Sequence, residues 1–368
     1  MRVLIVCGAG IVSGKEIMCL QLIRELKHRG VECYCITSSW GSSDFKDRLQ
    51  SLNVPYRALR IGFISKTLTW DAIRMTLEQF LYLPGLFIRY RSIIRRENPE
   101  IVIHTNFHHL FLLYPVLGNR RNFYWSHEII SDQPFYRNLF RRFAKKVLLF
   151  ISVSDAVAAS LKALIDEKKV VTIKNGIDEP ACLPRMAGAN NVMTIAIAGQ
   201  VAPHKGHDLL LQALSNLLPG QFLVKIIGSG DPLYVTQLKS LAESLNLTPY
   251  IAWTGFIKDT NMIYEGVDAM IVPTRTPDPY PTIVIEAAMR GIPSIGSNIG
   301  GLPEMIEHGV TGFLFQAGDA DDLCAMIKKM ADRKTNQPMY DDVLRFAKRN
   351  FGLDRFVDEF EKVIKQSN

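Results

Sequence analysis

The sequence predicts an α/β protein of two domains, each with a parallel, doubly wound sheet. Apolar runs of strand length alternate with amphipathic stretches of helix length, which is the pattern of βαβ units. The chain has 368 residues, enough for two ordinary domains. The alternation breaks once, at residues 178–191, where two prolines, a glycine and two asparagines indicate a linker.

The first domain is expected to cover residues 1–177. It begins with a strand over Arg2–Cys7, a helix over Gly14–His28 and a strand over Val31–Thr37. A mixed segment, Tyr56–Arg96, is rich in aromatic residues and arginine and is expected to be helical in its second part. Later strands are expected near Ile101–His104, Asn122–Ser126, Leu148–Val153 and Val170–Ile173.

The second domain is expected to cover residues 192–350, followed by a C-terminal segment, 351–368. A strand ends at Ala198 and a helix starts near Gly206. The last stretch, Asp354–Lys365, has the spacing of an amphipathic helix. The elements between them are strands over Phe222–Ile227, Tyr250–Thr254 and Ala269–Pro273, and a helix near Val235–Leu245.

Composition favours a packed globular protein, because 48% of the residues are hydrophobic and 21% are charged. No apolar window is long enough to predict a transmembrane helix. The apolar run Val3–Cys7 is too short for a secretory signal. The six cysteines, among them Cys33 and Cys35 on one strand, suggest buried reduced thiols, no metal site and a cytoplasmic location.

The net charge of +7 is unevenly distributed. Residues 1–180 contain 26 Lys and Arg against 16 Asp and Glu, and the remainder contains 17 against 20. A basic half predicts an anionic partner, which could be phosphate, nucleic acid or a membrane surface. Basic and apolar residues alternate around Arg89–Arg91, Arg95–Arg96, Arg137, Arg141–Arg142 and Lys145–Lys146.

A glycine-rich loop from Cys7 to Glu16 lies between the first strand and the first helix, where backbone amides can approach a phosphate. A dinucleotide fingerprint would need glycine at Ser13. A P-loop would need glycine at Ala9 and a hydroxyl at Glu16. The loop therefore excludes an ATPase and disfavours a dehydrogenase, and an ordinary tight turn explains its glycines equally well.

The segment from Pro277 to Pro293 predicts a short, apolar and buried helix between Pro281 and Gly291. Free amides at its start, on Thr282 and Ile283, together with the helix dipole, would favour a diphosphate. Glu286 lies inside this helix, and a buried carboxylate needs a partner or a function. It could hold the hydroxyls of a ribose, or form a structural ion pair.

Other loops that follow predicted strands are rich in glycine. The loop Gly199–Asp208 includes Lys205, which could reach phosphate oxygens or could be an ordinary surface lysine. Glycines at strand ends permit close approach of the backbone to a ligand. They occur in Gly228-Ser229-Gly230, Gly255-Phe256 and Gly300-Gly301-Leu302-Pro303-Glu304.

These motifs, in this order, resemble the second domain of the retaining GT-B glycosyltransferases of family 4, the group 1 transferases. The resemblance covers most of residues 192–316 and includes Asp278 and Glu286, which match an acidic residue and a glutamate separated by seven residues. It is weaker over the first half. There it rests on the segments Ser13–Glu16, Ser126-His127-Glu128, Val153-Ser154 and Lys174–Asp178.

The resemblance implies two Rossmann-like domains facing across a cleft, with the C-terminal helix packed back on the first domain. It implies a nucleotide-diphosphate sugar as donor, of UDP or GDP type, and neither a metal nor another cofactor. Lys205, Gly14 and the amides of Thr282 and Ile283 would neutralise the leaving diphosphate. Glu286 would hold the ribose, Asp278 a sugar hydroxyl, and His127 would lie near the reacting carbon. A strand-end histidine packed by its neighbours explains His127 equally well. Further donor contacts are expected from Ser13, Gln200, Gly228, Phe256 and Tyr280.

Three residues depart from the family pattern and make the identity of the donor uncertain. Gln200 stands where an arginine is usual, and Lys15 or Arg275 could supply the missing charge. Asp278 is one methylene shorter than the commoner glutamate. Pro281 replaces a glycine and so removes a backbone donor.

The predicted function is transfer of a sugar to a glycan or a lipid-linked acceptor, as in bacterial surface polysaccharide or lipopolysaccharide synthesis. The basic first half suggests a cytoplasmic protein at the anionic face of the inner membrane, although solvated helix faces explain the same pattern. Nucleic acid is disfavoured as a partner, because no recognised binding module is present. The alternatives are a GT-B sugar-nucleotide epimerase and a non-catalytic subunit that binds nucleotide sugars.

Overall fold

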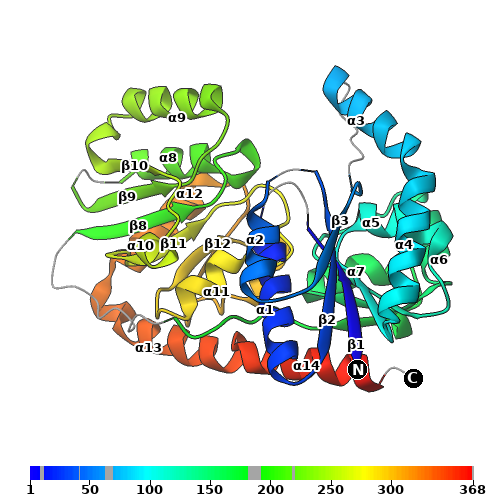
Figure 1. Cartoon of the computed structure of the whole chain (residues 1–368). Coiled ribbons are helices and arrows are strands. Elements are labelled where there is room, and N and C mark those ends of the chain that lie inside the picture. Colours follow the sequence, from blue (N-terminus) through cyan, green and yellow to red (C-terminus); the bar gives the residue numbers. More distant parts are fainter. Residues whose placement is uncertain (9–11, 41, 63–68, 181–191, 218–219, 367–368) are drawn as a thin grey trace. The chain divides into compact units, whose positions relative to one another are not determined.

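The computed structural model describes residues 1–8, 12–40, 42–62, 69–180, 192–217 and 220–366. The chain divides into two compact units, which we call unit 1 and unit 2. Unit 1 comprises Met1–Asn175 and Phe356–Asn368, and unit 2 comprises Gly176–Arg355. Each unit has one parallel sheet with helices packed around it (Figure 1). The α/β class and the two sheets expected from the sequence are confirmed.

Unit 1 has a sheet of seven parallel strands in the order β3-β2-β1-β4-β5-β6-β7. Val3 of β1 pairs with Cys33 of β2 on one side and with Ile101 of β4 on the other. The strands are β1 (Arg2–Val6), β2 (Glu32–Ser38), β3 (Tyr56–Leu59), β4 (Ile101–His104), β5 (Arg121–Ser126), β6 (Val147–Ser152) and β7 (Val170–Thr172). The helices are α1 (Gly14–His28), α2 (Asp44–Ser51), α3 (Trp70–Leu81), α4 (Leu83–Glu97), α5 (Phe107–Leu113), α6 (Pro134–Phe143) and α7 (Asp155–Lys162).

Unit 2 has a sheet of six parallel strands in the order β10-β9-β8-β11-β12-β13. The strands are β8 (Met193–Ala198), β9 (Phe222–Ile227), β10 (Ile251–Gly255), β11 (Ala269–Val272), β12 (Ser294–Ser297) and β13 (Gly312–Phe315). The helices are α8 (His207–Ser215), α9 (Pro232–Ser244), α10 (Thr260–Tyr264), α11 (Thr282–Ala288), α12 (Ala320–Ala331) and α13 (Arg333–Asn350), with a 3-10 turn, η3 (Pro203–Lys205).

Both sheets reverse their direction of growth at one point. In unit 1 this point lies between β1 and β4, and in unit 2 between β8 and β11. The loops that leave such a pair of strands run to opposite faces of the sheet, which opens a crevice at the carboxyl ends of the strands. The loops after β1, β4, β8 and β11 are therefore the places where side chains can meet a ligand.

The last helix, α14 (Leu353–Gln366), belongs to unit 1 from Phe356 onward. Its apolar face covers Trp125 of β5, whose ring centroid lies 5.7 Å from that of Phe356 and 5.1 Å from that of Phe360. Arg29, at the end of α1, donates to Asp358 at 2.5 Å and to Glu361 at 3.1 Å. The expected packing of the C-terminal helix on the first domain is therefore seen in unit 1.

The sequence analysis missed two strands of unit 2. β12 contains two serines and a glycine, so it lacks the apolar run that predicts a strand, yet all four of its residues are buried. Small residues are needed there, because a Cβ on Gly296 would lie 2.8 Å from Ile306. β13 is a four-residue strand between turns. Most of the predicted linker, residues 181–191, lies outside the described residues.

Candidate functional site

The first part of the candidate site lies where the sheet of unit 2 changes direction. The loop after β8 contains η3, and the loop after β11 runs from Pro273 toward α11. Two hydrogen bonds join these loops: the amide of Arg275 and the hydroxyl of Thr274 donate to the carbonyl of His204, at 2.8 and 3.1 Å. Gly206 permits this approach, because a Cβ there would lie 1.9 Å from the carbonyl oxygen of Pro273. The two loops are thus fixed against each other by backbone contacts.

Lys205 and Asp278 meet at this junction. The Lys205 ammonium donates to a carboxylate oxygen of Asp278 at 2.8 Å, and the two side chains are 32% and 17% exposed. Both groups are therefore open to solvent but restrained in position. An ammonium at the carboxyl edge of a parallel sheet can form an ion pair with a phosphate, and a carboxylate beside it can accept hydrogen bonds from hydroxyls.

A second loop supports the Asp278 segment. The amide of Gly301 donates to the carbonyl of Asp278 at 2.8 Å. A Cβ on Gly300 would lie 2.4 Å from that carbonyl oxygen, and one on Gly301 would lie 2.1 Å from the carbonyl oxygen of Pro279. The paired glycines are thus required because two backbones pack together here.

Glu286 lies one turn inside α11 and is partly buried. The hydroxyl of Tyr264, from α10, donates to its carboxylate at 2.8 Å. Burial raises the pKa of Glu286, and the hydrogen bonds from Tyr264 and Thr282 and the charge of Arg290 oppose that rise. Arg290, the cation nearest in sequence to this carboxylate, donates to the backbone carbonyl of Glu286 at 3.0 Å.

Arg290 completes a buried network around Tyr264. Its guanidinium lies 4.4 Å from the centroid of the Tyr264 ring and donates to the side chain of Asn261 at 2.8 Å. Sequence analysis missed all three of these residues. Arg290 follows Glu286 by four positions, which is a helical neighbour's spacing, but nothing local in the sequence links Tyr264 or Asn261 to α11.

The helix α11 begins after Pro281, which is its N-cap. Thr282 and Ile283 are its first two residues and are partly exposed, and the first amides of a helix have no partner within that helix. Tyr280 is instead 5% exposed, and its ring packs edge-on against that of Phe351 at 6.3 Å. The two amides predicted to bind the diphosphate are therefore on partly exposed residues, whereas Tyr280 is part of the core.

The remaining residues predicted to bind the donor in unit 2 lie at the ends of β8, β9 and β10. Gln200 is exposed, and Phe256 is 76% exposed. A Cβ on Gly228 would lie 1.8 Å from the carbonyl oxygen of Gly199, so this glycine is required by the protein itself. The amide of Gly228 also donates to the carbonyl of Gly255 at 2.8 Å.

Two cations were considered as substitutes for the arginine that Gln200 replaces. The guanidinium of Arg275 lies 2.8 Å from the carboxylate of Asp208. The ammonium of Lys15 lies 3.5 Å from the carboxylate of Glu16, and its side chain is 15% exposed. Each of these cations thus has a carboxylate partner within its own unit, as Lys205 has in Asp278.

In unit 1, the loop after β1 leads into α1 through a capping box. The amide and the hydroxyl of Ser13 both donate to the Glu16 carboxylate, at 3.1 and 2.5 Å. Glu16 is 1% exposed. The Ser13 hydroxyl thus has a structural role. Gly14 is the first residue of α1, and residues 9–11 of the glycine-rich loop lie outside the described residues.

His127 lies just after β5, and its ring centroid is 4.4 Å from that of Trp125. Burial and the charge of Lys15 hold the pKa of His127 well below its ordinary value. The same two causes, with smaller contributions from other histidines, lower the pKa of His109 to about 3. Both imidazoles are therefore neutral at pH 7 and can donate or accept a hydrogen bond without carrying charge.

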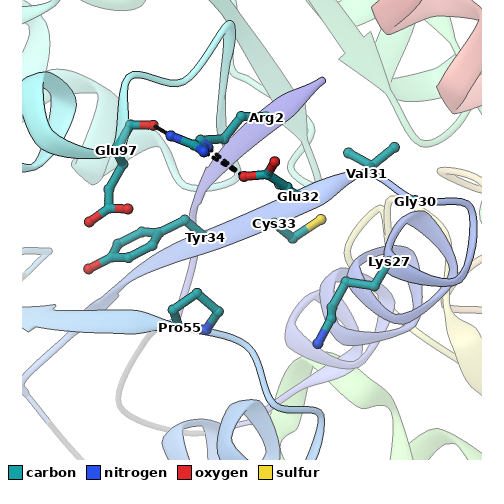
Figure 2. A pocket seen from close by; sticks show the side chains of 9 residues that line it. All are labelled: Arg2, Lys27, Gly30, Val31, Glu32, Cys33, Tyr34, Pro55 and Glu97. Carbon is teal, nitrogen blue, oxygen red and sulfur yellow. Dashed lines mark hydrogen bonds and ion pairs between the residues drawn. The ribbon is translucent and has the colours of Figure 1, made fainter.

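A pocket of about 440 Å³ opens elsewhere in unit 1 (Figure 2). Its charged groups are already satisfied: Arg2 donates to Glu32 at 2.8 Å and to the carbonyl of Glu97 at 2.5 Å. Lys27 donates to the carbonyls of Leu52 and Asn53. Because Arg2 and Glu32 begin their strands, this pocket is at the amino ends of β1 and β2, away from the loops that carry the candidate site.

Two family models match the chain. The model described as Glycosyl transferases group 1 matches residues 188–348, and the model described as Glycosyltransferase Family 4 matches residues 12–179. Together they contain every predicted site residue. The chain is a glycosyltransferase.

Relatives of this glycosyltransferase carry related names. The N-acetyl-alpha-D-glucosaminyl L-malate synthase of Bacillus anthracis is 22% identical over 96% of this chain and 93% of its own length. An uncharacterised glycosyltransferase of Haemophilus influenzae is 25% identical over 46% of this chain. That match spans about half of the Haemophilus protein, 48% of its length.

Solved structures show the same GT-B fold over the whole glycosyltransferase chain. Anabaena Alr3699/HepE in complex with UDP-glucose is 19% identical, with a TM-score of 0.80 over 99% of each chain. The apo form of the lipopolysaccharide outer core galactosyltransferase WaaB is 14% identical, with a TM-score of 0.78 over all of both chains. The expected GT-B fold is therefore confirmed.

Proposed function

We propose that this glycosyltransferase moves a sugar from a UDP or GDP donor to a glycan or lipid-linked acceptor, with retention of configuration and without a metal ion. We further propose that it acts in bacterial surface polysaccharide or lipopolysaccharide synthesis at the cytoplasmic face of the membrane. The solved structures that share the fold include one in complex with UDP-glucose and one named for lipopolysaccharide synthesis. These names support the donor and the pathway by similarity only.

The observation that carries the proposal is the contact between Lys205 and Asp278 at the switch point of the unit 2 sheet. The pair places a cation beside a hydroxyl acceptor, 2.8 Å apart, in the loops on either side of that point. A nucleotide sugar presents a diphosphate beside a set of sugar hydroxyls. Lys205 matches the diphosphate side of the bond that breaks, and Asp278 matches the sugar side.

Breaking the anomeric bond leaves negative charge on the diphosphate and positive charge on the sugar. Lys205 and the first amides of α11 would stabilise the diphosphate, since fixed donors aimed at developing charge lower the barrier. Glu286 would hold the ribose and Asp278 a sugar hydroxyl. Neutral His127 would donate a hydrogen bond near the reacting carbon, because its lowered pKa keeps it uncharged. The acceptor hydroxyl would then attack from the face that the diphosphate leaves, so that its oxygen bonds to the anomeric carbon and its proton passes to the departing diphosphate.

The donor is tested by thermal shift against nucleoside diphosphates and their sugars. A ligand at 100 times its dissociation constant adds about 2.7 kcal/mol to the free energy of unfolding. Turnover of the identified donor in excess EDTA tests metal independence, and loss of activity that added Mg²⁺ or Mn²⁺ restores would contradict it. NMR of the product's anomeric proton tests retention.

The same measurements separate the alternatives named from the sequence. An epimerase would convert the sugar nucleotide with no acceptor present. A non-catalytic subunit would bind the nucleotide and release none of it with any acceptor. Release of nucleotide that depends on an acceptor, with a new glycosidic bond in the product, supports the transferase.

A further inference from the structure

Helix α3 of unit 1 buries a polar side chain and exposes large apolar ones. Gln79 is fully buried and donates to the carbonyl of Arg60 at 3.1 Å. The residues that it exposes include Trp70, Leu77 and Leu81, at 87%, 59% and 79% of their surface. A surface helix of a globular protein normally turns its apolar stripe toward the core.

Three exposed apolar residues of α3 form one stripe, and a fourth, Phe80, which is 46% exposed, lies outside it. At about 100° per residue, Trp70, Leu77 and Leu81 fall within roughly 40° of one another around the helix axis. Gln79 lies on the opposite side. Figure 1 shows α3 projecting away from the sheet of unit 1, with α4 following it. Isolated exposed apolar side chains are ordinary, but a stripe of large ones that includes tryptophan indicates an interaction surface. Arg74, which is 68% exposed, lies on the same side of the helix between Trp70 and Leu77.

The stripe continues into the start of α4. Tyr82, between the two helices, is 44% exposed, and its ring lies 4.0 Å from the guanidinium of Arg60. Ile88 is 70% exposed. Arg91 and Arg95 are exposed and follow Ile88 at spacings of three and seven residues, so they share its face of α4. Aromatic, aliphatic and cationic groups are thus adjacent along one surface.

We propose that this surface, which we call the α3–α4 surface, docks the enzyme on an anionic lipid bilayer. It comprises Trp70, Leu77, Leu81 and Tyr82 together with Ile88, Arg91 and Arg95. Trp and Tyr favour the boundary between headgroups and hydrocarbon, and arginines bind anionic headgroups. The proposal deepens the proposed function, since a lipid-linked acceptor would be met at that boundary.

Charge favours a bilayer over a second copy of the chain. A symmetric dimer through the same surface would place the Arg91 and Arg95 side chains of both copies in one interface. Anionic lipids instead complement these arginines. The surface lies on the membrane rather than in it: α3 has 12 residues, and within the described part of the chain no helix is long and apolar enough to cross a bilayer.

The test is flotation of the full chain with large unilamellar vesicles, made of phosphatidylcholine alone or with 30% phosphatidylglycerol, the latter fraction being roughly that of an anionic leaflet. We expect binding to the anionic vesicles that weakens at high salt. The double variant Leu77→Gln/Leu81→Gln should lower the partition coefficient about tenfold or more, since it removes two inserted side chains. Arg91→Gln/Arg95→Gln should lower it on the order of tenfold, by reducing attraction to the headgroups.

The matched control is Leu233→Gln, which changes a leucine on α9 of unit 2 that is 69% exposed. It should leave the partition coefficient unchanged. A blue shift of tryptophan emission on vesicles that is absent in Trp70→Phe would place α3 at the lipid. Circular dichroism confirms that each variant is folded.

Equal binding of the Leu77→Gln/Leu81→Gln variant and the wild type would overturn the proposal. So would a dimer, seen by analytical ultracentrifugation, that the Leu77→Gln/Leu81→Gln variant abolishes, because the surface would then bind a second copy. Stabilisation by the nucleotide donor is measured without vesicles. If that stabilisation persists while vesicle binding is absent, the docking surface is wrong and the proposed use of a nucleotide-sugar donor stands.

Discussion

At the scale of single residues, the site depends on partners that are distant in sequence. Lys205 and Asp278 are 73 positions apart, and their loops meet because β8 and β11 are neighbours in the sheet. Glu286 receives its hydrogen bond from Tyr264, 22 positions earlier. In both pairs, one member is held in place by the other before any ligand arrives.

The variant Lys205→Ala tests the role of the cation. Turnover should fall by roughly 10²–10³-fold, by analogy with loss of one donor that stabilises developing negative charge. Initial rates of nucleotide release measure it. The control is Lys239→Ala on α9, an exposed lysine, which should keep the wild-type rate. A folded Lys205→Ala enzyme at full speed would show that this lysine does not contact the diphosphate.

The variant Tyr264→Phe tests whether the hydroxyl positions Glu286. The KM for the donor should rise roughly three- to tenfold, the usual worth of one hydrogen bond, while kcat changes little. The control is Tyr250→Phe, in a 3-10 turn remote from α11 in the chain. A purely structural role for Tyr264 would lower the melting temperature without this separation of KM from kcat.

The pH dependence of donor binding gives a second readout for Glu286. The ionised carboxylate accepts ribose hydroxyls, so binding should strengthen as pH rises through the raised pKa of Glu286. The Tyr264 hydrogen bond lowers that pKa, so the step should move to higher pH in Tyr264→Phe. It should vanish in Glu286→Gln. A step that persists in Glu286→Gln would assign it to another group.

The sequence identified candidate site residues but not the side chains that surround them. Lys205, Asp278 and Glu286 occur in motifs that can be read along the sequence. The network of Tyr264, Asn261 and Arg290 forms no such motif, because α10 and α11 come into contact only in the folded chain. Tyr280 was expected at the donor but is buried against Phe351, because sequence spacing cannot show which way a loop side chain turns.

At the scale of elements, the carboxyl edge of the unit 2 sheet is held together by backbone contacts. The ends of β8, β9 and β10 touch through Gly199, Gly228 and Gly255. Long apolar strands such as β1 were predictable from composition, and so were the helices with clear caps. β12 was not predictable from composition. Its residues are small because neighbouring side chains leave little space there, and they are not an apolar run.

The variant Gly228→Ala tests this backbone contact. The new Cβ would lie 1.8 Å from the Gly199 carbonyl oxygen, at a φ of +136°, so the free energy of unfolding should fall by about 3 kcal/mol or more. The control is Gly309→Ala, which also has a positive φ, +80°, but has open space at its Cβ. It should cost about 1–2 kcal/mol. Equal losses in urea denaturation would show that the contact adds nothing to the strain of φ.

At the scale of the whole molecule, both units bury neutral histidines. Burial lowers the pKa of His104 to about 4, that of His109 to about 3 and that of His207 to about 4. An unfolded chain binds protons on these residues near pH 6.5, whereas the folded chain does not. Their contribution to stability is therefore complete above pH 6.5 and is lost as pH falls toward 4 and 3.

We accordingly expect an acid-sensitive fold. Below pH 6.5 each of these histidines should add roughly 1.4 kcal/mol per pH unit to the slope of unfolding free energy against pH. Urea denaturation between pH 4.5 and 7.5 measures the slope. His104→Gln should reduce it, and His28→Gln, at a position 69% exposed, should not. An unchanged slope in His104→Gln would mean that this imidazole is protonated in the folded chain.

The contact between Lys205 and Asp278 has a consequence for the catalytic cycle. If Lys205 serves the diphosphate, an incoming donor must draw the ammonium away from an internal carboxylate, so capture is weaker than the positive charge alone would allow. The product nucleotide competes with the same carboxylate, because Asp278 can bind the lysine again once the sugar has been transferred. An internal carboxylate that competes for Lys205 lowers the affinity for the nucleotide and speeds release of the product. The enzyme would then be less inhibited by the nucleotide that it produces.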